Sequence, residues 1–277
     1  MGYKVAASHT TGSVTHTLPP LLDLRQACTD LAEAAALEIM RIYAGDLGVR
    51  DKADKSPVTD ADHAAELVIV AGLRALTPGL PVVAEEEMAA GHVPKIDGGP
   101  FWLVDPLDGT KEFIKRNGEF TVNIALIENG RPTLGIVLAP ATETLWRGAA
   151  GLGADKRQGS GAFTAISTRP CPPQGLTACA SRSHAIYSDL DIWFRNNNLT
   201  VADRVQAGSS LKFCLIAEGK ADIYPRFGPT NEWDTAAGQG VLEAAGGEVV
   251  TTDDRPLLYG KPRFSNPHFI ARSMAAR

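Results

Sequence analysis

Five short apolar segments follow one another between residues 80 and 148, and this succession constrains the fold more than any other feature of the chain. Each segment is shorter than an ordinary helix, and turn residues separate it from the next, which is typical of strands. Asn129-Gly130 predicts a tight hairpin between two of them. We therefore expect a sheet built from the segments LPVVA, FWLV, FTVNIALI, LGIVLA and TLWRG.

Helical patterns precede this run of strands. Leu21 to Ala44 carries apolar residues at helical spacing and is followed by Gly45, a common helix stop. Thr59 and Asp62 resemble a capping box that begins a second helix, over Asp60 to Leu76. Two helices are thus available to cover one face of the sheet.

The second half of the chain alternates strand-like and helix-like segments. LTACAS indicates a strand, and we expect helices over Asp189 to Asn196 and over SSLKFCLIAEG, which ends at Gly219. The small-residue run WDTAAGQGVLEAAGG predicts a further helix that begins at Asp234. Sheets and helices are mixed along the whole chain, which indicates an α/β protein with layers of both.

Length and composition suggest one extension and two lobes. The 277 residues fit one large domain or two closely packed ones. Residues 151–173 are rich in Gly, Ser, Pro and Thr, so we place a boundary there, between an N-terminal lobe over 21–155 and a C-terminal lobe over 156–277. Residues 1–20 are polar, lack the apolar core of a signal peptide and are expected to form a flexible extension.

The charge and cysteine content exclude several classes of partner. A formal net charge of −5 gives no basic field that would recruit nucleic acid or anionic lipid. No segment approaches the roughly 20 apolar residues of a membrane-spanning helix. The four cysteines are scattered and form no Cys-x-x-Cys pair, as in proteins of reducing compartments. We expect a cytoplasmic protein without a nucleic-acid partner.

Two aspartates follow the apolar segment FWLV, in the stretch FWLVDPLDGTKEF. Asp105 ends the expected strand, and Asp108-Gly109 turns the chain. Two carboxylates so close repel each other unless a cation lies between them, and carboxylate and carbonyl oxygens suit Mg²⁺. The carbonyl of Leu107 could add a third oxygen. The alternative is an Asp-Gly hairpin turn, which explains Asp108 but not Asp105.

Two further acidic positions could join this site. Glu85 to Glu87 follow the strand LPVVA, although an acidic run is also typical of a solvated loop. Asp234 opens the small-residue helix, where the alternative is a simple N-cap. Ligands of α/β proteins bind at the carboxyl ends of strands, so strands that both end in carboxylates favour a shared site.

These motifs together resemble a known family. DPLDGT, with EEE before it and WDTAAGQGVLEAAGG after it, resembles the two signatures of the inositol monophosphatase superfamily of Mg²⁺-dependent, Li⁺-sensitive phosphomonoesterases. The resemblance extends from about Leu21 to the C-terminus and implies a five-layer α-β-α-β-α sandwich. Within the superfamily, SRSH, GSSLKFCLIAEG and YPRFGPTNEWDTAAG are similar to the bacterial 3′(2′),5′-bisphosphate nucleotidases.

The resemblance implies roles for individual residues. Thr110, paired with Asp60, falls on the positions that orient the attacking water, and Glu85 takes part in its activation. The backbone of Gly109 and Thr110 falls where the reacting phosphate is held. Family members often have Ser before the first Glu, where this chain has Ala84, and the carboxylate of Glu85 is retained. The metal-ligand positions, for two or three Mg²⁺, are those of Glu85, Asp105, the Leu107 carbonyl, Asp108 and Asp234.

The second lobe carries the implied substrate preference. Arg226 stands where related inositol monophosphatases tend to have an acidic residue, which suits a substrate with a second phosphate. Ser209, Lys212 and Arg226 match positions that hold a 5′-phosphate in the nucleotidases, and His184 matches a position beside the adenine. The alternatives are ordinary surface charge for Lys212 and Arg226, and a loop histidine without a role for His184.

The implied activity is hydrolysis of the 3′-phosphate of adenosine 3′,5′-bisphosphate to AMP and phosphate, and of 3′-phosphoadenylyl sulfate, in connection with sulfate assimilation. One alternative is an inositol-1-phosphate phosphatase. Another is a non-catalytic sensor of nucleotide or metal, which the full set of carboxylates and Thr110 disfavours. The family includes monomers and homodimers, and the resemblance alone admits a peripheral location on the cytoplasmic face of the inner membrane.

Overall fold

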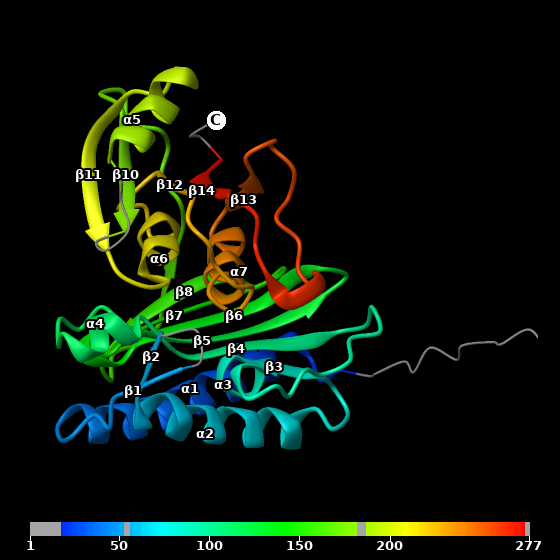
Figure 1. Cartoon of the computed structure of the whole chain (residues 1–277). Coiled ribbons are helices and arrows are strands. Elements are labelled where there is room, and N and C mark those ends of the chain that lie inside the picture. Colours follow the sequence, from blue (N-terminus) through cyan, green and yellow to red (C-terminus); the bar gives the residue numbers. More distant parts are fainter. Residues whose placement is uncertain (1–17, 53–55, 182–186, 275–277) are drawn as a thin grey trace, which may run out of the picture.

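The protein folds into five alternating layers of helices and sheets, seen edge-on in Figure 1. The computed structural model describes residues 18–52, 56–181 and 187–274. In order, the layers are helices α1 (Leu21–Tyr43) and α2 (Asp60–Leu76), a seven-stranded sheet, helices α6 (Leu211–Ala217) and α7 (Ala236–Ala244), a five-stranded sheet, and helix α5 (Tyr187–Asn196). This order confirms the α-β-α-β-α sandwich.

All five predicted segments are strands of the seven-stranded sheet. β3 runs parallel to β4, and every later neighbour in the sheet is antiparallel. Both loop residues of the hairpin between β5 and β6, Asn129 (φ 52°) and Gly130 (φ 73°), have positive φ, which confirms the predicted tight turn. In spatial order the strands are β3 (Val82–Ala84), β4 (Phe101–Asp108), β5 (Thr121–Glu128), β6 (Arg131–Ala139), β7 (Thr144–Ala149), β8 (Gly153–Gln158) and β9 (Thr164–Ile166).

The five-stranded sheet contains the predicted strand LTACAS and stands on the other side of α6 and α7. Its spatial order is β11 (Val201–Ala207), β10 (Leu176–Ser181), β12 (Ile223–Arg226), β14 (Phe269–Ser273) and β13 (Gly247–Thr251). Smaller elements are the hairpin of β1 (Arg50–Asp51) and β2 (Pro57–Val58), helices α3 (Glu85–Ala89) and α4 (Thr110–Ile114), and 3₁₀ turns at Pro140–Thr142 and Pro262–Phe264.

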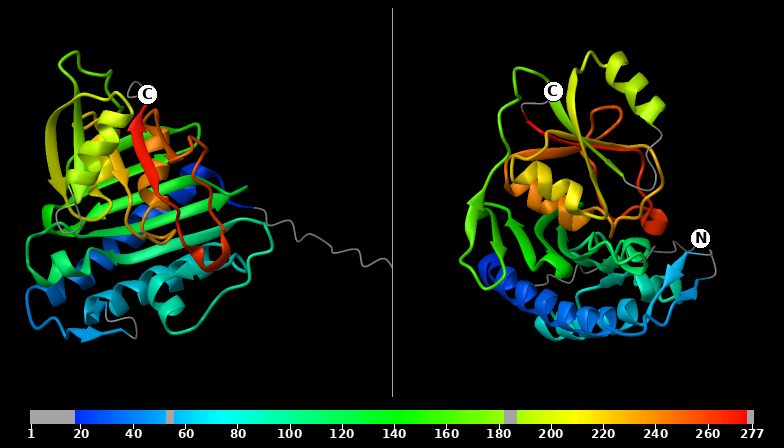
Figure 2. Two further views of the ribbon diagram at one scale, coloured as in Figure 1. Left: turned by 45° about the horizontal axis from the view of Figure 1, so that its top comes forward. Right: turned by 90° about the vertical axis from the view of Figure 1, so that its left-hand side faces the viewer.

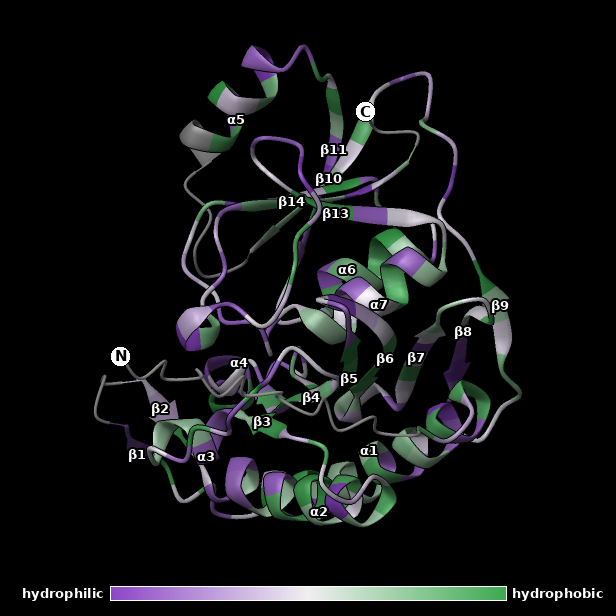
Figure 3. Ribbon diagram, turned by 90° about the vertical axis from the view of Figure 1, so that its right-hand side faces the viewer, coloured by the Kyte–Doolittle hydropathy of each residue, from purple (hydrophilic) through white to green (hydrophobic). Residues whose placement is uncertain are grey.

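Strand β4 is buried on both faces, as its continuous apolar run predicts. Trp102 and Val104 join the core under α1 and α2, whereas Phe101 and Leu103 join the core that contains α6 and α7. Successive side chains of a strand point to opposite faces, so one segment serves two cores. Figures 2 and 3 show α1 and α2 on the outer face of the sheet. The hydropathy colours of Figure 3 show hydrophobic residues on the central strands and α7.

Helix α7 lies directly on the seven-stranded sheet because the contact is made by residues without bulky side chains. A Cβ on Gly135 of β6 would lie 2.3 Å from the carbonyl oxygen of Ala237. The helix begins at Ala236, with Thr235 as its N-cap, and not at Asp234 as predicted. Close packing of α7 brings the segment before it, with Asp234, toward the end of β4.

The predicted lobe boundary after residue 155 falls inside β8, and the first sheet continues to Ile166. The second sheet begins at Leu176. Helices α6 and α7 share one hydrophobic core with strands of both sheets, so the two predicted lobes meet over a buried surface. Residues 1–17 of the predicted extension lie outside the described residues.

Candidate functional site

The end of β4 forms a sharp, internally bonded turn. The pairing of β4 with β5 is irregular between Asp105, opposite Asn123, and Asp108, opposite Thr121. The backbone N–H of Leu107 donates to Oδ1 of Asp105 over 3.1 Å. Gly109 follows with φ 93°, a left-handed conformation that favours glycine. This turn places the carboxylates of Asp105 and Asp108 three positions apart at the end of the strand.

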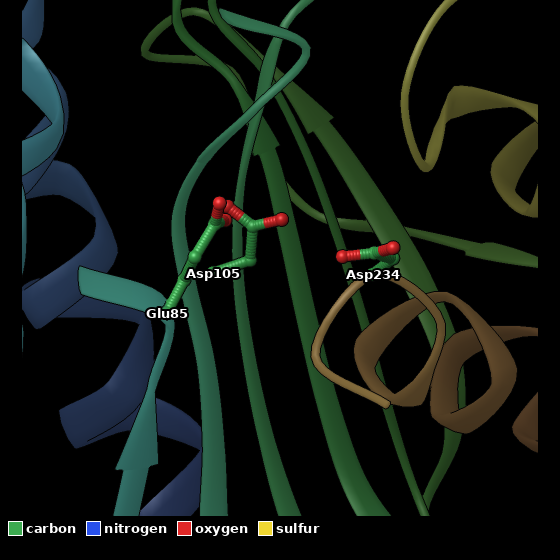
Figure 4. A group of neighbouring side chains, drawn as sticks. All are labelled: Glu85, Asp105 and Asp234. Atoms are coloured by element: carbon green, nitrogen blue, oxygen red, sulfur yellow. The ribbon is translucent and has the colours of Figure 1, made fainter. Parts of the chain in front are cut away.

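Three carboxylates from distant parts of the chain meet beside this turn. Glu85 begins α3 directly after β3, Asp105 lies near the end of the adjacent parallel strand β4, and Asp234 precedes α7. One carboxylate oxygen from each lies within 4.8 Å of the others. Figure 4 shows the three side chains gathered in one place. The structure therefore brings together three of the predicted ligand positions.

Asp108 is joined to this cluster through Ser210. The Ser210 hydroxyl lies 3.1 Å from Oδ2 of Asp108 and 3.1 Å from the carbonyl oxygen of Asp234, so it can donate to either. Asp234 is not an N-cap: its carboxylate accepts from the backbone N–H of Asn231 over 2.8 Å. Sequence reasoning missed Ser210, and its only signal was its place beside Ser209.

The electrostatics of the cluster favour a bound cation. Burial raises the pKa of Asp105 well above its usual value, and the charges of Glu85 and Asp108 add to the effect. Burial and the charge of Asp108 do the same to the pKa of Asp234. Burial raises the pKa of Asp108 to about 6, against the opposing influence of Lys212 and Ser210. Carboxylates forced together away from water suit a hard divalent ion with oxygen ligands.

The predicted pairing of Thr110 with Asp60 is wrong. The hydroxyl of Thr110 lies 3.2 Å from Oδ1 of Asp62, whereas the Asp60 carboxylate accepts from Arg50 over 2.6 Å and is 53% exposed. The inward-facing positions of a helix recur every three to four residues. In α2 the buried residues include Asp62 and Ala65 but not Asp60. The capping box had already marked Asp62, whose Oδ2 accepts from the Thr59 N–H over 2.7 Å.

Glu66, one turn after Asp62 on α2, is a second residue that sequence reasoning missed. Its two carboxylate oxygens accept the backbone N–H groups of Glu86 and Glu87, each over 2.8 Å. These bonds fix the start of α3, where Glu85 stands. The acidic run is therefore the beginning of a helix anchored to α2, and not a solvated loop.

The predicted second-phosphate residues line the same cavity as the carboxylates. This cavity has a volume of about 440 Å³, and its wall includes Glu85, Asp108, Gly109, Thr110, Ser209, Lys212, Arg226 and Asp234. Lys212 is not surface charge: only 4% of the residue is exposed, and burial lowers its pKa to about 8. Its ammonium donates to the carbonyl oxygens of Ala207 and Ser209.

Two polar atoms beside Lys212 are buried without a partner among the described residues. They are Oγ of Ser209 and Nε of Arg226. A buried donor that lacks an acceptor is unfavourable, which makes this part of the cavity suited to an anion. His184, the predicted contact to the base, lies outside the described residues.

Comparison with known proteins supports one family for the whole described fold. The model of the inositol monophosphatase family matches residues 21–276. The curated 3′(2′),5′-bisphosphate nucleotidase CysQ of Escherichia coli (strain K12) is 48% identical over 250 residues, which are 89% of this chain and 98% of that protein.

Solved structures agree with this match. The crystal structure of CysQ from Bacteroides thetaiotaomicron, a bacterial member of the inositol monophosphatase family, has a TM-score of 0.76 and 39% identity, over 91% of this chain and 97% of that one. An inositol monophosphatase from Anabaena (Nostoc) sp. PCC 7120 has a TM-score of 0.72 and 26% identity, over 92% of each chain. Within the described ranges, no helix has both the length and the apolar character needed to cross a membrane. From the family match, the five-layer fold and the carboxylate cluster together, we conclude that the chain belongs to the inositol monophosphatase family.

Proposed function

We propose that the protein is a phosphoric monoester hydrolase that removes the 3′-phosphate of adenosine 3′,5′-bisphosphate to give AMP and phosphate. The observation that carries the proposal is the cavity itself. It combines a carboxylate cluster for the reacting phosphate with Ser209, Lys212 and Arg226 for a second one. The CysQ nucleotidases, at up to 48% identity, support the same substrate class. 3′-Phosphoadenylyl sulfate carries the same 3′-phosphate and is the second substrate that we propose.

The donor set fits Mg²⁺, and we propose two ions for each site. Carboxylate and carbonyl oxygens are the ligands that Mg²⁺ prefers, and the mutual repulsion of the buried carboxylates in the cluster favours a bound cation. Bound Mg²⁺ would stabilise the negative charge that builds on the attacking and leaving oxygens. The residues that would hold the ions are Glu85, Asp105, Leu107 through its carbonyl, Asp108 and Asp234.

The chain's own contribution is to orient the attacking water and remove its proton. Thr110 donates its hydroxyl proton toward Asp62 and can accept a hydrogen bond from the water. Burial raises the pKa of Asp62, which makes it a better proton acceptor than a carboxylate in water. As the water oxygen bonds to phosphorus, its proton moves through Thr110 to Asp62. The bond to the ribose 3′-oxygen breaks, and that oxygen takes a proton from solvent.

The backbone would hold the reacting phosphate in place during this step. Gly109 and Thr110 stand at the start of α4, where N–H groups have no acceptor within the helix. Both residues line the cavity beside Asp108. Their N–H groups can therefore donate to the phosphate oxygens while Lys212 and Arg226 hold the 5′-phosphate.

The test is the turnover of two substrates by an Arg226→Ala variant. A hydrogen bond to a charged group is worth about 1.5–3 kcal/mol, so kcat/KM for adenosine 3′,5′-bisphosphate should fall roughly 10- to 150-fold. The value for inositol 1-phosphate should change little. Lys111→Ala, which removes a charge from another part of the cavity wall, is the matched control. Unchanged nucleotide turnover by Arg226→Ala would contradict the proposed second-phosphate site.

A further inference from the structure

One lysine is bound directly to the carboxylate cluster. The ammonium of Lys52 lies 2.7 Å from Oε1 of Glu85 and 2.6 Å from Oε1 of Glu86. Its side chain is 11% exposed, and that of Glu86 is 4% exposed. The ammonium therefore bridges a member of the cluster and a buried neighbour that lies outside it.

The position of Lys52 is set by the short hairpin at the cavity wall. The backbone N–H of Lys52 donates to the carbonyl oxygen of Ser56 over 2.8 Å, directly beside the paired residues Asp51 of β1 and Pro57 of β2. Ser56 and Pro57 line the cavity. Arg50, another cation of the hairpin, binds Asp60, and no ion pair among the described residues joins it to the cluster.

The pair of contacts is asymmetric with respect to a metal ion. Glu85 is a proposed metal ligand, whereas Glu86 is not, and the backbone N–H of Glu86 donates to Glu66, which fixes the position of this residue. A Mg²⁺ ion binds a carboxylate oxygen at about 2.1 Å. An ion on Glu85 would then stand within a few ångströms of the Lys52 ammonium, where two positive charges repel strongly in a partly buried site.

We propose that Lys52 competes with the metal ion for Glu85. Lys52 balances Glu85 and Glu86 before a metal binds, and metal binding breaks the Lys52–Glu85 contact while Glu86 keeps the ammonium. The apparent metal affinity of the protein is therefore lower than its carboxylates alone would give. This inference rests on the metal-binding part of the proposed function.

The first test is calorimetric titration of metal-stripped protein with Mg²⁺ and with Mn²⁺. The Lys52→Gln variant lacks the competing ammonium. Coupling between two binding events is typically 5- to 150-fold, so the Kd of this variant for the metal ion should be lower than that of the wild type by roughly that factor. Arg50→Gln makes the same change of charge on the same hairpin and should stay close to the wild type. Lys52→Arg keeps the charge and should keep the weaker affinity.

The outcomes separate this inference from the proposed function. If Lys52→Gln binds metal no more tightly than the wild type, or if Arg50→Gln gains as much metal affinity as Lys52→Gln, the proposed competition is contradicted. Either result leaves the proposed metal site standing. If the wild-type protein binds neither ion, the metal site itself fails.

A second test uses the wild-type protein and does not depend on the folding of a variant. Breaking the Lys52–Glu85 contact should leave the ammonium more reactive, so acetylation of Lys52, followed by mass spectrometry, should become faster when Mg²⁺ is added. Lys95, whose side chain is 86% exposed, serves as the internal reference. A Lys52 rate that stays constant or falls, relative to Lys95, would contradict the proposal.

Discussion

The hydroxyl of Thr110 and the carboxylate of Asp62, 48 residues apart in the chain, lie 3.2 Å from each other at the edge of the carboxylate cluster. Asp62 belongs to the first turn of α2, and Thr110 begins α4 after the turn of β4. Asp62 is held by its second oxygen through the capping box. The proposed proton acceptor is thus fixed by the same bonds that begin its helix.

Replacement of Asp62 by Asn should lower turnover far more than replacement of Asp60 by Asn. A positioned general base contributes typically 10²–10⁴-fold, so we expect kcat of Asp62→Asn to fall by about that factor with little change of KM. Asp60→Asn should remain within a few-fold of the wild type, because Asp60 binds Arg50 in an exposed position. Equal losses in the two variants, measured by phosphate release, would contradict the assignment.

The neighbouring serines Ser209 and Ser210 should give different kinetic changes. Ser210→Ala removes the link between Asp108 and Asp234 and should weaken metal binding and lower kcat for every substrate. Ser209→Ala should instead raise KM for the nucleotide bisphosphate and leave inositol 1-phosphate hydrolysis unaltered. Steady-state kinetics with both substrates, as a function of Mg²⁺, would distinguish them. The same change in both variants would argue against separate roles.

The stability of the metal-free protein should fall as the pH rises from about 4.5 to about 7. Burial raises the pKa of both Glu66 and Glu86 to about 7 in the folded protein, above the usual value of 4.5. A carboxyl group with a raised pKa favours the folded state at low pH, and this contribution is lost as the pH rises through the folded-state pKa. Lys212 stays protonated throughout this window, since its pKa is lowered only to about 8.

Thermal unfolding with and without Mg²⁺ measures this effect. Each kcal/mol of lost stability lowers Tm by about 2–4 °C in a protein of this size class. Tm without metal should therefore be higher at pH 5.5 than at pH 7.5, and Mg²⁺ should raise it most at pH 7.5. A metal-free Tm that increases over this range would contradict the assignment of raised pKa values.

Close packing of α7 on the sheet should matter for both stability and metal binding. Gly135→Ala places a methyl group against the carbonyl of Ala237, and overpacking of this kind costs typically about 1–3 kcal/mol. A shift of α7 would also displace Asp234, so metal affinity should fall with Tm. Gly99→Ala, at a position where an added Cβ meets nothing within 4 Å, is the control. Metal affinity unchanged in Gly135→Ala would show that Asp234 is positioned independently of the helix contact.

The parts of the fold that sequence predicts well are those governed by local pattern. The apolar run of β4 and the Asn129-Gly130 hairpin follow from strand alternation and turn chemistry, and both are confirmed. The predicted lobe boundary falls inside β8, because most residues of this strand are polar and only partly buried. By composition β8 resembles a linker, and only its pairing with β7 shows that it is a strand.

The site divides in a similar way. Glu85, Asp105 and Asp234 could be named from motifs, yet their convergence depends on the parallel pairing of β3 with β4 and on the packing of α7. The family resemblance implies Asp60, whereas the buried residues of α2 include Asp62, and a motif alone does not distinguish the two faces of the helix. The contacts of Lys52 join residues 33 and 34 positions apart, and no local pattern predicts them.

The most direct measurement is Mg²⁺-dependent phosphate release by the wild-type protein from adenosine 3′,5′-bisphosphate and from inositol 1-phosphate at equal concentrations. The account predicts a strong preference for the nucleotide, since only that substrate carries a second phosphate for Ser209, Lys212 and Arg226. A preference for inositol phosphate would keep the metal site and contradict the second-phosphate site. No release from either substrate would contradict the catalytic function itself.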